Sequence, residues 1–144
     1  MKNKYLITLN ASQTVNGENE EMTFTAPAEY SIGEDGVKII QYKEYTEEAI
    51  TKDDFLLTTV KVVSDEKVSV TRQSKYTSKL FLEKHKIHQS QYKTPMGSVV
   101  FSVMCTAIND KLGETGGKLE VVYNLLHGAQ LISENRFIIT VKEN

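Results

Sequence analysis

The stretch QYKTPMGSVVFSV, residues 91–103, places a proline and a glycine between two segments that both have the composition of β-strands. Pro95 has the fixed φ that suits position i+1 of a type I turn, and Gly97 follows at i+3, where a left-handed residue forms a bulge. A phosphate-binding loop would need several glycines leading into a helix, whereas residues 98–108 alternate as a strand. Residues 91–103 therefore predict a β-hairpin.

Toward the N-terminus the same two-residue period continues, with Tyr5, Ile7 and Leu9 on one face of a predicted strand. Asn16-Gly17 interrupts this period and predicts a type I′ hairpin turn, because both residues tolerate positive φ. Among all segments, only TEEAITKDD, residues 46–54, favours a helical turn.

Toward the C-terminus the period of two predicts three long strands, at residues 98–108, 118–126 and 129–142. Residues 109–117, NDKLGETGG, are rich in turn formers and predict a longer loop, and His127-Gly128 predicts a two-residue hairpin turn. About ten strands with frequent turn signals are typical of a sandwich or barrel. We therefore predict an all-β fold, either a sandwich or a barrel, that forms one domain over residues 1–144.

Charge and cysteine content exclude several classes of protein. The chain has 17 basic and 19 acidic residues and a net charge of −2, so it lacks the basic excess that dominates nucleic-acid binding. Its one cysteine cannot form an intramolecular disulfide, and the N-terminus shows no secretory leader. Apolar runs are far too short to cross a bilayer. We expect a cytoplasmic protein with neither nucleic-acid nor membrane partners, and the sequence leaves the oligomeric state open.

Candidate reactive residues are few. His85 and His88 resemble a fragment of a metal site, but zinc needs three or four converging ligands, so a solvated pair is expected. Cys105 lies in phase with Val103 and Ala107, where a thiol behaves as a small buried hydrophobe, and no base is identified that would activate it as a nucleophile. No catalytic residue, metal or cofactor is predicted.

Two polar residues lie in the apolar phase of their predicted strands and are candidates to line a cavity. Arg72 is in phase with two valines of its strand, and Asn135 lies among apolar residues of the last strand. If these phases face inward, both side chains need a partner or a ligand. The structural interpretation is favoured over ligand contact: Arg72 caps the barrel end and Asn135 bonds to the backbone. Tyrosines at mid-strand could add hydroxyls, so the candidate ligand-binding residues are Arg72, Tyr92, Tyr123 and Asn135.

Several stretches together resemble a known family. The Tyr-x-Thr-Pro-x-Gly turn within residues 91–103, the loop GETGGKLEVVYNL and the closing GAQLISENRFIITVKE resemble the YwiB-like bacterial proteins of unknown function. The similarity runs over essentially the whole chain. It implies a cytosolic single-domain protein whose fold is a single antiparallel up-and-down β-barrel of about 8 to 10 strands, similar in shape to the lipocalin-like, or calycin, barrels. We adopt this barrel over a sandwich as the predicted fold. The family has no established activity or functional residues that the resemblance could transfer.

Three functions remain open at the level of sequence. A noncatalytic binder of a small amphipathic or anionic molecule is favoured, because barrels of about eight strands can enclose one small ligand. The alternative is a protein-interaction module whose barrel is filled by its own side chains and which uses an exposed strand edge. An enzyme is the third reading, and the least favoured one, because no acid-base pair can be named.

Overall fold

The computed structural model describes residues 5–45, 55–74 and 77–144, and for residues 92–94 the backbone alone. These residues form ten β-strands and no helix, so the all-β prediction is confirmed. The helical turn predicted at 46–54 lies outside the described residues. The strands are β1 Tyr5–Val15, β2 Glu18–Ile32, β3 Lys38–Tyr45, β4 Phe55–Ser64, β5 Lys67–Gln73, β6 Thr77–Glu83, β7 Ile87–Thr94, β8 Gly97–Gly113, β9 Gly116–His127 and β10 Gln130–Glu143.

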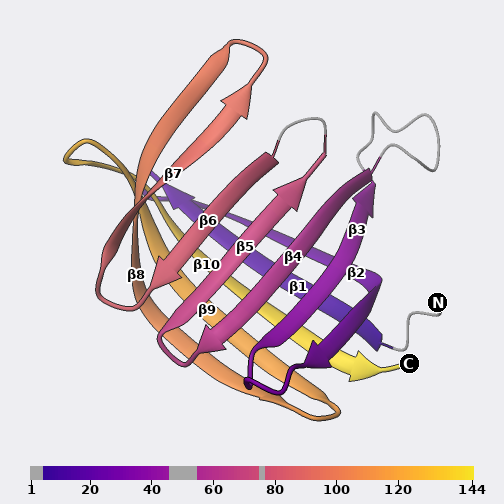
Figure 1. Cartoon of the computed structure of the whole chain (residues 1–144). Helices are drawn as coiled ribbons and strands as arrows, with labels where there is room; N and C mark the ends of the chain where they lie inside the picture. Colours follow the sequence, from indigo (N-terminus) through magenta and orange to yellow (C-terminus); the bar gives the residue numbers. More distant parts are fainter. Residues whose placement is uncertain (1–4, 46–54, 75–76) are drawn as a thin grey trace.

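All ten strands belong to one antiparallel sheet with the spatial order β6-β5-β4-β3-β2-β1-β10-β9-β8-β7. Figure 1 shows this sheet curled into a nearly closed barrel. Sheet neighbours are consecutive in the chain except where β1 pairs with β10. The predicted up-and-down arrangement is confirmed, with the seam of the barrel between β6 and β7.

At the seam, β6 and β7 meet through side chains instead of a backbone ladder. Leu80 and Leu82 of β6 are buried in the barrel, so Phe81 between them points outward. The Phe81 ring lies 6.2 Å from the ring of His88, which shares the buried face of β7 with Ser90. β7 therefore contacts β6 through the outward-facing side chain of Phe81.

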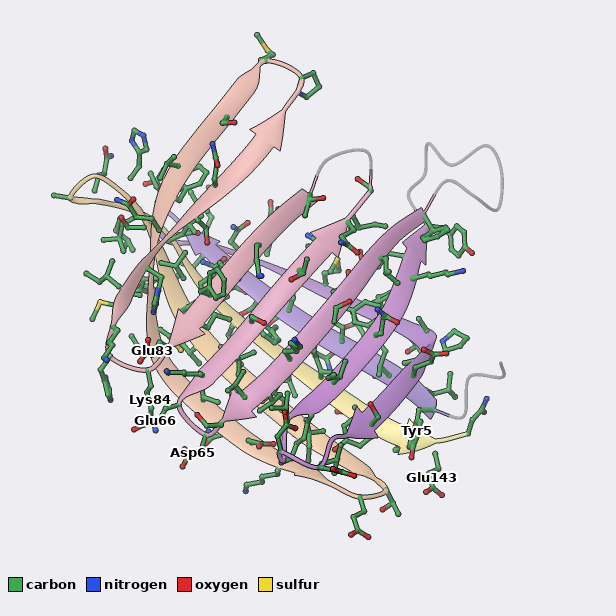
Figure 2. The ribbon with its side chains drawn as sticks, in the orientation of Figure 1. Tyr5, Asp65, Glu66, Glu83, Lys84 and Glu143 are labelled. Atoms are coloured by element: carbon green, nitrogen blue, oxygen red, sulfur yellow. The ribbon has the colours of Figure 1, made fainter. Side chains whose placement is uncertain are left out.

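The lower end of this seam is held by hydrogen bonds. Nε2 of His88 lies 2.8 Å from Oε1 of Glu83, and the backbone N–H of His85 donates to the Cys105 carbonyl. Hydrogen bonds from His88 and then Lys86 hold the pKa of Glu83 below its usual range. The backbone N–H of Lys84 donates to the carbonyl of Glu66 in the β4–β5 turn, and Figure 2 shows the two residues side by side.

The core fills one end of the barrel. Alternate residues of the strands point inward there, and Ile7, Ile40 and Leu119 are completely buried. Tyr30 donates its hydroxyl to the Gly113 carbonyl at 2.7 Å, and its burial is the main cause that raises its pKa to about 12. This end is packed with the protein's own side chains.

Two predicted turns are confirmed. Asn16 and Gly17 both have positive φ, 51° and 80°, as a type I′ turn requires. Thr94 pairs with Gly97 across the two residues of the β7–β8 hairpin, and Gly97 has a φ of 119°.

Two predictions near the C-terminus are wrong in their boundaries. The predicted loop 109–117 is mostly strand, because β8 continues to Gly113 and β9 begins at Gly116. The ladder between these two strands holds residues with turn composition in an extended backbone. The last hairpin turn is Gly128-Ala129, since His127 pairs with Gln130. The turn is shifted by one residue, which places the positive φ of 63° on Gly128.

Replacing Gly97 with valine should destabilise the protein by about 1 to 3 kcal/mol, because a β-branched residue is forced to positive φ. A Cβ at this position meets no atom within 4 Å, so backbone strain is the whole effect. Urea unfolding measures the change, with Ser98→Val as the neighbouring control that keeps an ordinary strand residue. An unchanged midpoint for Gly97→Val would contradict the strain.

Candidate ligand cavity

A cavity of about 410 Å³ lies at the other end of the barrel, where β1, β3 and β5 end and β2, β4 and β6 begin. Its floor is apolar and includes Leu9, Val60, Leu80, Phe137 and Ile139. At its rim Met22 is 52% exposed, so the cavity opens to solvent. The barrel is thus filled at one end and hollow at the other.

A cluster of polar side chains lines one wall of the cavity. Arg72 of β5 donates from Nη2 to Oε2 of Glu44 in β3 at 3.0 Å, and Thr58 of β4 donates to Oε1 of the same carboxylate at 3.4 Å. Tyr42 lies beside them and is almost fully buried. Its burial and then the negative charge of Glu44 raise the pKa of Tyr42 well above its ordinary range, so its hydroxyl stays protonated.

The opposite wall comes from β9 and β10. Asn135 is buried and donates from Nδ2 to Oγ of Ser133 at 2.9 Å. The partner of the Asn135 Nδ2 group is therefore the side chain of the buried serine two residues earlier on the same face. The ring of Tyr123 stands edge-on to Phe137, 6.4 Å away. Amide, hydroxyl and aromatic groups thus face the cavity together.

Three of the four residues predicted from the sequence line this one cavity: Arg72, Tyr123 and Asn135. The fourth, Tyr92, lies in β7 opposite Val99, and its side chain is outside the described part of the chain. No described residue of β7 lines the cavity, so a role for Tyr92 stays a prediction.

Sequence reasoning missed Glu44 and Thr58. Glu44 is in phase with the buried Ile40 and Tyr42, which is the signal that would have identified it. An acidic residue near a strand end is normally solvated, so Glu44 was assumed to lie on the surface.

Among the described residues at the rim of the cavity, acidic side chains without an ion-pair partner outnumber basic ones. Glu20 and Glu21 line the cavity and form no ion pair with any described residue. Arg136 also lines it, but this residue is paired with Glu120. Hydrogen bonds from Asn109 and Arg136 keep the pKa of Glu120 below its usual range, so the pair stays charged.

The reactive residues considered from the sequence lie outside the cavity lining. Cys105 is fully buried, its Sγ faces the Ala107 carbonyl at 3.6 Å, and burial raises the pKa of the thiol, which disfavours the nucleophilic thiolate. His88 has Glu83 as its partner, and the residues described contain no group of three potential metal ligands. Within the same ranges no helix has the length and apolar character needed to cross a membrane.

Comparison with known proteins supports the fold and the family. The crystal structure of the ywiB protein from Bacillus subtilis matches with a TM-score of 0.82 and 18% sequence identity, covering 97% of this chain and 91% of that chain. At this identity the likeness shows the fold. No curated protein matches the sequence. The family model described as a domain of unknown function, DUF1934, matches residues 7–139, so the chain belongs to the DUF1934 family.

Proposed function

We propose that the protein binds one small amphipathic molecule in the cavity at the open end of the barrel. The observation that carries this proposal is an apolar floor beneath a polar wall within one cavity of about 410 Å³. Ligand pockets typically measure roughly 300 to 1,000 Å³ and combine a mostly apolar lining with a few placed polar groups. The apolar part of the ligand would rest on Leu9, Val60 and Ile139, with its polar group at the wall.

The charges favour an uncharged or zwitterionic polar group over a purely anionic one. Arg72 is already paired with Glu44. Glu20 and Glu21 at the same rim, which form no ion pair with any described residue, would repel an anion. Arg72 remains available for a hydrogen bond to a ligand, because its side chain is 47% exposed. Exposed ion pairs of this kind contribute only about 0 to 1 kcal/mol to stability, so the pair with Glu44 rearranges at little cost. A zwitterion would meet both members of the Arg72–Glu44 pair.

Thermal unfolding with a panel of amphiphiles tests this function. The panel holds a monoacylglycerol, a lysophosphatidylcholine and a fatty acid of equal chain length, all below their micelle concentrations. A ligand at about 100 times its dissociation constant stabilises the fold by about 2.7 kcal/mol, which raises Tm by roughly 5 to 10 °C. We expect the zwitterion or the neutral lipid to give the larger shift. No shift with any member of the panel would contradict the proposal.

Two variants locate the binding. Ala11→Trp fills the cavity from β1 and should abolish the shift, whereas Ala129→Trp, in the exposed β9–β10 turn, should leave it unchanged. Arg72→Met keeps most of the apolar stem and should weaken binding of the zwitterion, with the exposed Lys61→Met as its control. Equal binding to Ala11→Trp and the wild type would place the ligand elsewhere.

A further inference from the structure

The β7–β8 hairpin extends beyond the rest of the sheet. β8 pairs with β9 only from Ser102 onward, so among the described strands Ser98, Val99 and Val100 pair with β7 alone. Figure 1 shows this part of the hairpin projecting away from the barrel as a two-stranded ribbon. A two-stranded ribbon is marginally stable in water unless further strands or another surface support it.

The projecting ribbon is apolar and exposed on both of its faces. Val99 and Val100 point to opposite faces, yet they are 39% and 46% exposed, and Met96 at the tip is 98% exposed. The backbone of β8 beside these valines faces no strand of the described chain on the β9 side. Natural sheets usually protect such an edge with charged residues, proline or a bulge.

Charge protection is missing at this edge. Residues 94–109 contain no Asp, Glu, Lys or Arg, although a quarter of the chain is charged. A strongly acidic or basic partner would find no opposite charge along this strand. An identical strand fits, because two copies of Ser98–Val100 aligned antiparallel oppose no like charges and bring β-branched side chains into cross-strand contact.

We propose that the free edge of β8 at Ser98–Val100 is a docking surface for a second copy of this chain. Two ribbons joined about a twofold axis would form a four-stranded antiparallel sheet in the order β7-β8-β8-β7 across the two copies. This pairing supplies the strands that each ribbon lacks. It leaves the ligand cavity untouched, since no residue of β7 or β8 lines it among those described.

Sedimentation equilibrium over a wide range of protein concentration tests the proposal with a charge exchange. Ser98→Lys/Val100→Lys and Ser98→Glu/Val100→Glu each place like charges opposite one another in a homodimer and opposite charges in a mixed dimer. The wild type should show a concentration-dependent dimer. For each variant alone, the dissociation constant of the homodimer should rise at least about tenfold. An equimolar mixture of the two variants should recover the dimer.

Val15→Lys/Val63→Lys is the matched control, because it introduces two lysines at exposed valines away from the ribbon. Circular dichroism first establishes that every variant is folded. A wild type that stays monomeric up to its solubility limit overturns the proposal. So does a dimer that survives in both charge variants, which would be formed by another surface, or one that is lost equally in the Val15/Val63 control.

Discussion

Replacing Gly117 with alanine is expected to lower the free energy of unfolding by about 2 to 6 kcal/mol, the largest loss that we expect from a single methyl group in this chain. Gly117 has a φ of 141°, a region that side-chain-bearing residues rarely adopt. An added Cβ would also overlap the backbone carbonyl oxygen of Lys111 on β8, which cannot move without disturbing the ladder. Backbone strain and steric overlap therefore act together.

Denaturant unfolding of Gly117→Ala and Gly17→Ala separates the two causes. Gly17 also has positive φ, but a Cβ there meets nothing within 4 Å, so strain alone should cost about 1 kcal/mol. Equal losses in the two variants would show that the close approach of β8 and β9 at Gly117 is absent in solution.

Replacing Leu119 with alanine should cost about 2 to 5 kcal/mol and lower Tm by on the order of 10 °C. Leu119 is completely buried in the filled end of the barrel, where it lies opposite Ile139 on the neighbouring strand. Removing its branched side chain leaves a cavity, because the close-packed neighbouring side chains can move only slightly to fill it. Calorimetry provides the measurement.

Leu131→Ala is the control for this prediction, because Leu131 lies in the strand next to β9 but is 49% exposed. Its loss should stay below about 1 kcal/mol. If the two leucine variants unfold at the same temperature, the packed end of the barrel does not carry the stability assigned to it.

The period of two was enough to predict the strands, because each inward face must be apolar over nearly its whole length. The resemblance to the YwiB-like proteins then favoured a barrel over a sandwich. The period of two also placed Arg72 and Asn135 on inward faces, and Tyr123 was chosen as a mid-strand tyrosine. The structure brings all three to one cavity. The period of two does not predict the position of each residue along the barrel axis. That position depends on the register of ladders between strands far apart in sequence, such as Gln13 opposite Asn135.

The errors have the same origin. Residues 109–117 have turn composition, yet most of them pair across the β8–β9 ladder, so tertiary pairing overrides local propensity. Glu44 reaches the cavity wall only because β3 and β5, each paired with β4, bring it to Arg72. The contact at the seam, where Phe81 of β6 meets His88 of β7, has no local sequence signal because it joins the two edge strands of the sheet.

The pairing of β1 with β10 affects how fast the chain is expected to fold, because it joins the first and last strands of the sequence. Tyr5 lies opposite Glu143, and Figure 2 shows the two residues at the same corner of the barrel. A circular permutant that joined this corner by a short linker and was cut between Glu83 and Ile87, where no ladder is broken, would visit the strands in the order β7 to β10 and then β1 to β6. Every ladder in it would join consecutive strands. The native chain must instead form a backbone ladder between two strands from its opposite ends, a long loop closure that slows folding. In the permutant the long-range closure would move to the β6–β7 seam, where side-chain contacts such as Phe81 with His88 take the place of a ladder.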